Sequence, residues 1–437
     1  MVRSPRSIKA PTPRSLAGRT PRPRWRSPIR GPWLTSVFGA VLLVGIPIEF
    51  ITGLISYAAY NPRLAGNDMT PQHGILSFYL FNWVTSPSWI YRASQGVHVL
   101  LGLALLPVLL AKLWSVIPRL FAWPALRSAA HLLERASLVL LVGGAVFEFA
   151  TGILNIDYDY SFRFSFYNGH FYGAWLFIAG FMVHAGLKVG PMRRALGSRS
   201  LRREMSTDLA HTVPEPIPGE SGSDSLIATE PKPPTISRRG VLALVGGGSL
   251  AVFLLTAGES IHPLRRLSLL APRTLSYGSG PNAFQVNRTA TAARIRTVHT
   301  GPDWRLVLGG SDGREVSLSR PELLAMNLIT AELPIACVEG WSTLQRWNGV
   351  RLLDLARRVG IDHPTGAIVE SLERHGAFSR ASLSGRQVRA GASLLALRVN
   401  GADLSLDHGF PARIIVPAAP GVHNTKWVAR ITFSEVR

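Results

Sequence analysis

The chain has 437 residues, of which 47% are hydrophobic and only 17% charged, and 47 Lys and Arg against 26 Asp and Glu give a net charge of +21. This balance leaves two classes, a nucleic-acid-binding protein or a membrane protein. Nine basic residues and no acid lie in the first 30 positions, and a second basic group, 188–203, follows a long apolar run. Such blocks are typical of the cytoplasmic flanks of membrane spans. The sequence therefore favours membrane lipid as a partner and argues against nucleic acid.

Taken in chain order, the sequence predicts five parts. Residues 1–33 form a disordered basic cytoplasmic tail, and 34–190 contain four apolar stretches long enough to span a bilayer. A Pro-, Ser- and Glu-rich cytoplasmic linker at 191–236 precedes a fifth apolar span at 237–258. Short alternating segments separated by turn residues at 275–437 predict strands and a few helices. The expected fold class is multi-domain: an all-α transmembrane four-helix bundle, a fifth transmembrane helix, and a mixed α+β domain.

The charges on either side of the spans predict the topology. The first four spans are expected at 34–58, 94–117, 132–154 and 170–190. The basic tail places the N-terminus inside, so an even number of spans returns the chain inside at the second basic group. The fifth span then places the residues after it outside. We therefore expect a multi-pass protein of the cytoplasmic (inner) membrane of a bacterium, with a cytoplasmic N-terminus and an extracytoplasmic C-terminal domain.

The membrane half contains an internal repeat. Glu49-Phe50-Ile51-Thr52-Gly53-Leu54 closes the first span, and Glu148-Phe149-Ala150-Thr151-Gly152-Ile153 closes the third. Each is followed by an aromatic-rich loop and then by a span that begins with a histidine, His98 or His170. Two helix pairs related by duplication predict a four-helix bundle with a site between its halves.

Four histidines lie near the ends of the predicted spans, where an ionisable side chain needs a partner or a metal. His98 and His170 lie at the outer ends, and His131 and His184 at the inner ends. His170 and His184 are about 21 Å apart on one helix face, which fits two haems stacked across a bilayer better than one site. The sequence predicts one or two b-type haems, with His98 paired to His170 and His131 paired to His184. The alternative is that these are interfacial histidines that cap helices.

This arrangement resembles bacterial membrane b-type cytochromes that link soluble redox domains to quinones. The resemblance implies quinone or quinol as a partner. The two carboxylates of the repeat, Glu49 and Glu148, have two interpretations. They relay protons for quinol chemistry, or they form hydrogen bonds to the neighbouring Thr52 and Thr151.

Cys337 is the only cysteine of the chain. A single cysteine excludes an intramolecular disulfide, a Cys₄ iron–sulfur cluster and a CxxCH haem attachment. Its ordinary interpretation is a buried apolar thiol. However, Cys337-Val338-Glu339-Gly340-Trp341 is followed by Trp347-Asn348-Gly349, by Asp407-His408-Gly409-Phe410-Pro411-Ala412-Arg413, and by Lys426-Trp427. These motifs in this order resemble the sulfite-oxidase-type molybdopterin domain.

That resemblance implies a molybdopterin cofactor whose molybdenum is bound by the Cys337 thiolate. It also implies a set of residues that hold the cofactor and its phosphate: Asn287, Arg288, His408, Arg413, His423, Asn424, Thr425 and Lys426. Arg288 is expected near the metal, where it acts with Cys337 as a catalytic residue and favours an anionic or strongly polar substrate. Trp341 and Trp347 are either core residues or cofactor contacts.

The fifth span begins with Ser237-Arg238-Arg239-Gly240-Val241-Leu242. This resembles a twin-arginine export signal, here internal, and implies the twin-arginine export machinery as a partner. Molybdopterin enzymes receive their cofactor in the cytoplasm and cross the membrane folded, which that pathway permits. The alternative is a pair of arginines that flank an ordinary transmembrane helix.

Because the chain ends at Arg437 without an added dimerisation domain, the resemblance extends to the bacterial periplasmic methionine-sulfoxide reductase catalytic subunit. It implies an enzyme that transfers an oxygen atom on a small sulfur compound and exchanges electrons with quinone through haem, expected to act as a sulfoxide reductase. Three alternatives stay open: a sulfite dehydrogenase that passes electrons to quinone, an electron conduit with a degenerate molybdenum domain, and a non-enzymatic membrane receptor or scaffold.

Overall fold

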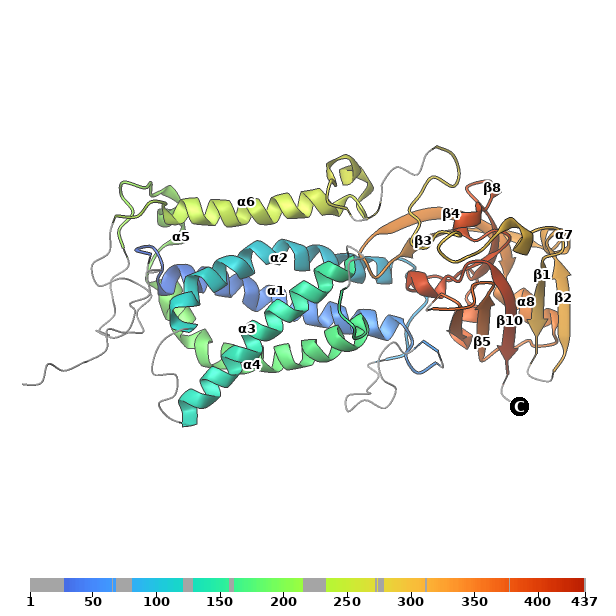
Figure 1. Ribbon diagram of the computed structural model, residues 1–437, viewed down its shortest axis with the longest axis horizontal. Coiled ribbons are helices and arrows are strands. Elements are labelled where there is room, and N and C mark those ends of the chain that lie inside the picture. The colour runs from blue at the N-terminus through green and yellow to red at the C-terminus, as the bar shows by residue number, and fades with distance from the viewer. Residues whose placement is uncertain are drawn as a thin grey trace, which may run out of the picture.

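The computed structural model has two parts, a set of long helices and, at one end of them, a domain of strands (Figure 1). It describes residues 27–64, 66–67, 81–120, 129–156, 161–214, 233–271, 273, 279–310, 313–376 and 378–435. Most of the predicted basic tail and the middle of the predicted linker lie outside these residues. We call the helix ends that meet the strand domain proximal, and the opposite ends distal.

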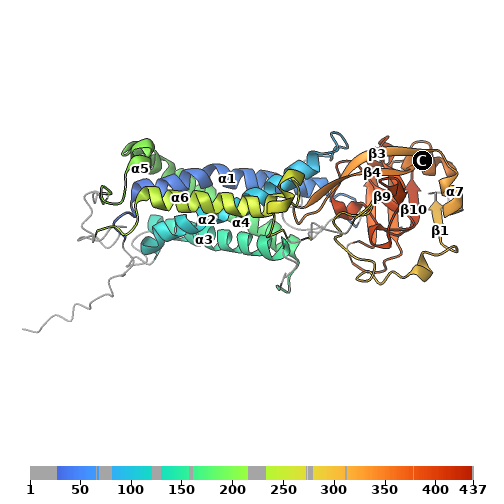
Figure 2. The ribbon, with the colours of Figure 1, turned by 90° about the horizontal axis from the view of Figure 1, so that it is seen from above.

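Five long helices run along the length of the molecule (Figures 1 and 2). They are α1 (Pro32–Ala59), α2 (Ile90–Leu120), α3 (Ala129–Ile156), α4 (Phe166–Gly197) and α6 (Arg238–Ala257), and the short α5 (Leu201–Ser206) precedes α6. α1 packs on α2, α3 packs on α4, and α6 lies against α2. Successive long helices alternate in direction, so α1, α3 and α6 end proximally.

All five long helices have the length and the apolar composition needed to cross a membrane. The shortest, α6, has 20 residues, which corresponds to about 30 Å of helix. Large apolar side chains on their outer surface are exposed, among them Val44, Leu110, Val139, Met182 and Leu244. Exposed apolar surface of this extent is typical of a lipid-facing protein. The helical part is consistent with a membrane protein.

The strand domain contains ten strands among the described residues. Their bounds are β1 (Arg305–Gly309), β2 (Glu315–Ser319), β3 (Leu328–Ala336), β4 (Ser342–Arg351), β5 (Gly366–Ser371), β6 (Arg380–Ser384), β7 (Leu394–Val399), β8 (Ala402–Asp403), β9 (Arg413–Ile415) and β10 (Val428–Ser434). One sheet has the order β2-β1-β10-β5-β6, in which only β1 and β10 are parallel. The other is antiparallel, with the order β3-β4-β7-β8, and β9 pairs with β7.

Three short α-helices complete the domain: α7 (Arg320–Leu324), α8 (Leu352–Arg358) and α9 (Gly385–Arg389). The main core joins side chains of both sheets and of α8, including Leu306, Leu355, Leu397, Ile414 and Phe433, all buried. The strand β7 is a nearly continuous apolar run with one exposed residue. Such a run is typical of a central strand that is covered on both faces.

The segment between α1 and α2 contacts the strand domain, and both lie at the proximal end. The Trp83 indole donates a hydrogen bond to the carbonyl of Ala418 (2.6 Å). Asn67 makes two hydrogen bonds to the backbone of Ser382 in β6, donating to its carbonyl (2.8 Å) and accepting from its N–H (2.9 Å). The loop that follows the first helix and the C-terminal domain therefore lie on the same side of the helices.

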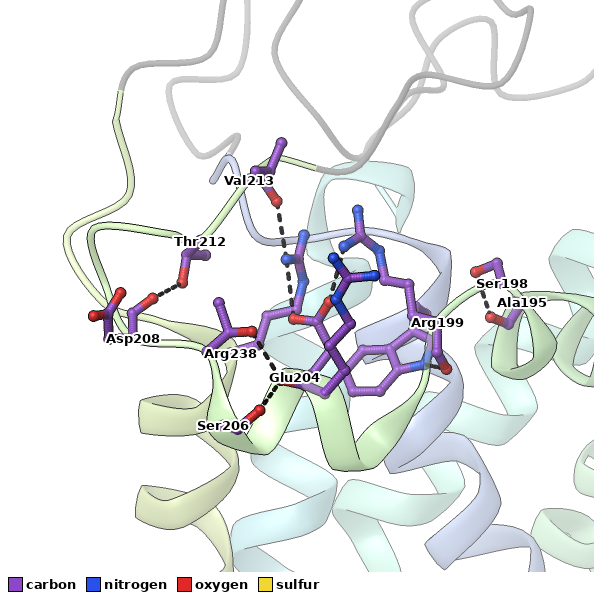
Figure 3. A network of polar contacts seen from close by, with 12 residues as sticks. Ala195, Ser198, Arg199, Glu204, Ser206, Asp208, Thr212, Val213 and Arg238 are labelled. Atoms are coloured by element: carbon purple, nitrogen blue, oxygen red, sulfur yellow. Dashed lines mark hydrogen bonds and ion pairs between the residues drawn. The ribbon is translucent and has the colours of Figure 1, made fainter.

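At the distal end, a buried ion-pair network joins α6 to the rest of the helices (Figure 3). Arg238, the first residue of α6, has only 1% of its side chain exposed and donates to the Glu204 carboxylate (3.4 Å) and to the carbonyl of Val213 (2.9 Å). Glu204 of α5 also accepts from Arg199 (2.9 Å). The Trp33 indole at the start of α1 donates to the carbonyl of Arg199 (3.1 Å). One arginine of the predicted export signal thus also has a structural contact.

The structure confirms a helical N-terminal part with five apolar helices and a mixed C-terminal domain. The first four expected spans lie within α1, α2, α3 and α4, and the fifth extends one residue beyond α6 at each end. α2 begins four residues earlier than expected, and α4 continues to Gly197. The expected linker contains α5 and the last turns of α4. The cytochrome character of the bundle and the domain boundaries stay predictions.

Replacing Glu204 with glutamine is expected to lower the thermal unfolding midpoint of the detergent-solubilised protein. The change removes the carboxylate from the buried Arg238, and removing one partner of a buried ion pair costs about 3–5 kcal/mol. Asp208→Asn is the matched control, because Asp208 pairs with His211 on the exposed surface, where such pairs contribute little. Equal midpoints for Glu204→Gln and the unchanged protein would contradict the role of this network.

Candidate functional site

Six of the predicted cofactor-binding residues line a polar pocket in the strand domain. About 390 Å³ of space between atoms lies within it, part of which is open to the surroundings. The lining includes the predicted residues Asn287, His408, Arg413, Asn424, Thr425 and Lys426. Sequence segments separated by more than 100 residues therefore meet at one site.

Each cation of this pocket is held by backbone carbonyl groups. Lys426 donates from Nζ to the carbonyls of Arg288 and of Asp407 (3.0 Å for the latter). Arg413 donates to the carbonyls of His408 (3.2 Å) and Asn424 (3.1 Å), and its guanidinium lies over the Trp347 ring. Carbonyl groups orient a cation without neutralising its charge. The positive charges of the pocket thus remain available to an anionic ligand.

Two contacts fix the orientation of the His408 ring. It stacks on Phe284 with 3.7 Å between ring centroids, and its Nε2 lies 2.9 Å from the carbonyl of Asn282. Since a carbonyl only accepts, Nε2 carries the proton in this contact. His408 ends the short helix Leu406–His408, whose first residue follows the capping Ser405.

Burial depresses the pKa of each basic side chain that lines the pocket, and of His423 near it. Burial lowers the pKa of Arg413 to about 9, and burial followed by repulsion from Arg413 lowers the pKa of His408 to about 3. Burial, and then Arg413, also hold the pKa of Lys426 well below its usual range. Burial lowers the pKa of His423 to about 4. A bound anion would stabilise the charged forms.

Several polar atoms at this site have no hydrogen-bond partner among the described residues. They are Arg413 Nε, Asn424 Nδ2, Thr425 Oγ1 and His423 Nδ1, all buried. Buried donors are ordinarily paired. An anionic group with several acceptor oxygens, such as the phosphate of a pterin cofactor, fits this donor set.

Cys337 lies in a tight turn between β3 and β4. Its N–H donates to the carbonyl of Trp341 (2.9 Å), and the N–H of Gly340 donates to the carbonyl of Cys337 (3.1 Å). Gly340 has a φ of +97°, a conformation that favours glycine. The flanking residues Ile335 and Trp341 line the polar pocket. The turn thus places the cysteine beside the pocket.

The Cys337 side chain is buried in an apolar cluster with Phe284, Ile335, Trp341 and Trp347. Burial, and secondly the charge of Glu339, raise the pKa of its thiol well above the ordinary value. A metal that binds the sulfur would displace this proton, because the ligand of a metal is the thiolate. A single soft sulfur in a shielded pocket fits a molybdenum ligand.

Besides Cys337, two predicted residues lie apart from the lining. Arg288 pairs with the buried carboxylate of Glu373, at 2.9 and 3.0 Å, and 38% of its side chain is exposed. His423 is buried and packs edge-to-face on Tyr60 at the end of α1, with 5.7 Å between centroids. The sequence did not predict that Glu373 holds Arg288 or that a helix residue covers His423.

A second, larger cavity lies between the helices at their proximal ends. It contains about 1480 Å³ of space between atoms, including space open to the surroundings. Its lining comes from α1, α2, α3 and α4, and includes His98, His170, Gly53 and Gly152. Val338, the residue after Cys337, also lines it. The cavity is thus next to the cysteine turn.

The His98 and His170 rings face each other across this cavity at 6.3 Å between centroids, with their planes at 87°. A metal–imidazole bond is about 2 Å long. Two imidazoles on opposite sides of one metal ion therefore have centroids about 6 Å apart. The observed spacing would therefore allow His98 and His170 to hold one metal ion between them.

The two histidines have the same surroundings, one from each repeat. His98 Nδ1 lies 3.1 Å from Thr52 Oγ1 and 3.2 Å from Glu49 Oε2, and His170 Nδ1 lies 3.0 Å from Thr151 Oγ1 and 3.1 Å from Glu148 Oε2. Both threonine hydroxyls donate to helix carbonyls. Each hydroxyl therefore accepts the proton of Nδ1, which leaves the lone pair on Nε2 for a metal.

These contacts bear on the interpretation of the two carboxylates. Glu49 and Glu148 contact the histidines, and the threonines bond to backbone carbonyls instead of to the carboxylates. The expected carboxylate–threonine hydrogen bond is therefore wrong among the described contacts. The second oxygen of each carboxylate is buried and has no partner in the described part of the chain.

The inner histidine pair stays a prediction. His131 lies in the first turn of α3, but its side chain is outside the described residues. His184 lies in α4, and the helix is continuous from His170 to His184. Among the described residues, no group of three or more His, Cys, Asp or Glu side chains is arranged to hold a metal ion.

Comparisons with known proteins identify the C-terminal region. The family model described as "Oxidoreductase molybdopterin binding domain" matches residues 293–437. The uncharacterized oxidoreductase YuiH of Bacillus subtilis (strain 168) is 32% identical over 133 residues, which cover 30% of this chain and 66% of YuiH. The mitochondrial sulfite oxidase of Drosophila melanogaster is 34% identical over 96 residues, which cover 21% of this chain and 17% of that protein.

A third relative is similar over a longer part of the chain. The protein-methionine-sulfoxide reductase catalytic subunit MsrP of Gluconobacter oxydans (strain 621H) is 27% identical over 240 residues, covering 50% of this chain and 73% of MsrP. Since this alignment covers half of the chain, it extends beyond 293–437. The alignments span less than two thirds of the length of YuiH and of the Drosophila sulfite oxidase, and more than two thirds of the length of MsrP.

The depressed pKa of His408 predicts how stability depends on pH. The pKa is about 3 in the folded protein and 6.5 ordinarily, so between these values the unfolded chain binds more protons. For protein from a host that makes no molybdopterin, the unfolding free energy is expected to fall as the pH drops from about 7 to about 5.

Thermal unfolding midpoints measured across this range test the prediction. His408→Gln should reduce the slope, and His363→Gln, which changes an exposed histidine, should leave it unchanged. A slope that is the same in His408→Gln and in the unchanged protein would show that His408 does not cause it.

Proposed function

We propose that residues 293–437, which match the family model of an oxidoreductase molybdopterin binding domain, form the catalytic unit of a membrane-bound enzyme that reduces sulfoxide-type substrates. The observation that carries this proposal is the position of Cys337 between two sites. The cationic pocket lies on one side of its turn, and the cavity with His98 and His170 lies next to Val338. We further infer that the substrate is reduced outside the cytoplasmic membrane, with electrons from quinol.

When bound, a molybdenum–pterin cofactor supplies two-electron oxygen-atom transfer, and b-type haem supplies one-electron transfer. The Cys337 thiolate would bind the metal. His408, Arg413 and Lys426 would hold the phosphate, and Asn424 and Thr425 would donate the hydrogen bonds that the described structure leaves unmade. Reduction of a sulfoxide consumes two electrons and two protons, and yields a sulfide and water.

The helix cavity fits a b-type haem. His98 and His170 would bind its iron through Nε2, and Gly53 and Gly152 would leave room beside the rings. A Cβ atom at Gly53 would lie 3.2 Å from Cε1 of His98. Thr52 and Thr151 would fix the ring orientation, and Glu49 and Glu148 would strengthen each histidine as a ligand by accepting from Nδ1.

The arrangement of the helices supports the proposed topology. The basic segment 188–203 and Arg238 lie at the distal end, whereas the loop after α1 and the molybdopterin domain lie at the proximal end. A distal end in the cytoplasm agrees with the positive-inside rule. In this orientation the pair His98–His170 lies near the outer surface, and export by the twin-arginine machinery would deliver the domain to that side.

Sulfite dehydrogenation is a second candidate. Sulfite oxidases are among the relatives, and the basic side chains of Arg413 and Lys426 in the pocket favour an anionic substrate. We favour the reductase because the similarity to the methionine-sulfoxide reductase subunit extends over half of this chain.

Metal and haem analysis of the purified protein tests the enzyme proposal. Protein from a host that makes molybdopterin is expected to contain molybdenum and haem. Cys337→Ser should lose molybdenum and keep the haem spectrum, because the turn and the helix cavity are separate sites. His98→Ala should lose haem and keep molybdenum, so each variant is the control for the other. An unchanged protein without molybdenum would refute the enzyme proposal.

The direction of the reaction is expected to appear in the haem spectrum. Methionine sulfoxide should oxidise the reduced haem of the unchanged protein, whereas sulfite should not reduce the oxidised haem. Cys337→Ser should respond to neither compound. Reduction of the haem by sulfite without oxidation by methionine sulfoxide would favour the dehydrogenase.

A further inference from the structure

The turn that carries Cys337 is held against the helices by a short set of contacts on α2. Arg92 and Gln95 are three residues apart on one helix, so they share a face. Arg92 donates to Ser342 Oγ (2.9 Å) and to the carbonyl of Ser260 (2.8 Å) after α6. Gln95 donates to the carbonyl of Val338 (2.7 Å).

The segment that follows α6 also contacts this turn. Ser260 donates from Oγ to the carbonyl of Gly340 (2.6 Å), and the N–H of Ser342 donates to the carbonyl of Glu259 (3.2 Å). The contact with α2 is close enough to require glycine. A Cβ atom at Gly340 would lie 2.6 Å from a methyl carbon of Val99, which follows the candidate ligand His98. The turn is thus fixed by two helices and one close approach.

Gln95 is the residue that joins this turn to the helix cavity. Its side chain is buried, it lines the cavity, and it is one helical turn from His98. Its amide oxygen accepts from Ser56 Oγ (2.7 Å), which fixes its NH₂ group toward Val338. Val338 lines the same cavity and is covalently next to Cys337, whose Cα is about 3.8 Å away across the peptide bond.

We propose that the turn Cys337–Trp341 is the electron-transfer junction between the molybdenum site and the helix cavity, and that Gln95 is the positioning residue that holds Val338 against the cavity. This inference rests on the proposed function. The junction passes one electron at a time and forms or breaks no bond. Two transfers from quinol-reduced haem supply the two electrons with which a sulfoxide and two protons yield a sulfide and water.

The experiment measures how fast substrate oxidises the haem in the full-length, cofactor-loaded protein. The haem is reduced, methionine sulfoxide is added, and haem absorbance is followed in a stopped-flow instrument. Gln95→Leu should slow this oxidation by about tenfold or more, because small displacements of a positioned group reduce rates steeply. Turnover with a reduced dye that donates directly to molybdenum should stay at the rate of the unchanged protein.

Asn67→Leu is the matched control. Asn67 is also a buried amide that docks the two parts, through Ser382, but it does not line the cavity. It should leave the rate of haem oxidation close to that of the unchanged protein. Ser56→Ala removes the hydrogen bond to the Gln95 amide oxygen and leaves Gln95 in place, so it should slow the oxidation less than Gln95→Leu. If Gln95→Leu does not fold, Ser56→Ala is the variant that tests the proposal.

Two results would overturn the junction. One is unchanged haem oxidation in Gln95→Leu with normal molybdenum and haem content, and the other is equal slowing in Gln95→Leu and Asn67→Leu. If the unchanged protein responds only to sulfite, the same comparison is made for haem reduction by sulfite. If its haem responds to neither compound, the proposed function fails and the junction fails with it. That outcome is distinct because it is seen in the unchanged protein.

Discussion

The contact between the cysteine turn and the proximal end of α2 is the constraint on which the arrangement of both sites depends. A turn of five residues has the polar pocket on one side and the helix cavity on the other. Its backbone carbonyls at Val338 and Gly340 are bonded to side chains of the helical part, so the two parts have little freedom to move relative to each other here. Because the contacts involve backbone groups as well as side chains, they fix the path of the chain and not only the position of one residue.

The polar pocket of the strand domain and the cavity between the helices differ in the charge of the groups that line them. In the pocket, the side chains of Arg413 and Lys426 are buried against carbonyls, and burial lowers their pKa values. In the helix cavity, neutral imidazoles are buried against carboxylates and threonines, which direct the proton to Nδ1. The first environment fits the proposed anionic pterin, and the second fits the proposed haem.

Much of the fold and of the candidate sites could be predicted from the sequence, for physical reasons. The spans follow from apolar length, and the pair His98–His170 follows from the repeat, because duplicated segments fold into equivalent places. The residues around the polar pocket could be named only through family resemblance, since they come together from distant segments. Gln95 and Glu373 were missed because an amide or a carboxylate inside an ordinary helix or loop carries no motif. The roles of His131 and His184 stay open, since the side chain of His131 lies outside the described residues.

The repeat is symmetric at the proposed metal-binding positions and asymmetric at the positions that contact the strand domain. Glu, Thr and His recur in both halves with nearly identical distances. Three residues before the histidine, however, the first half has Gln95 and the second has Tyr167. Gln95 bonds to the strand domain, whereas the Tyr167 hydroxyl lies 3.5 Å from that of Tyr60 within the helices. A duplicated helix pair needs only one half to dock a single domain. The two halves therefore differ at the position of Gln95 and Tyr167 and agree at the histidines. This pattern is expected if histidine geometry and docking are separate constraints on the helices.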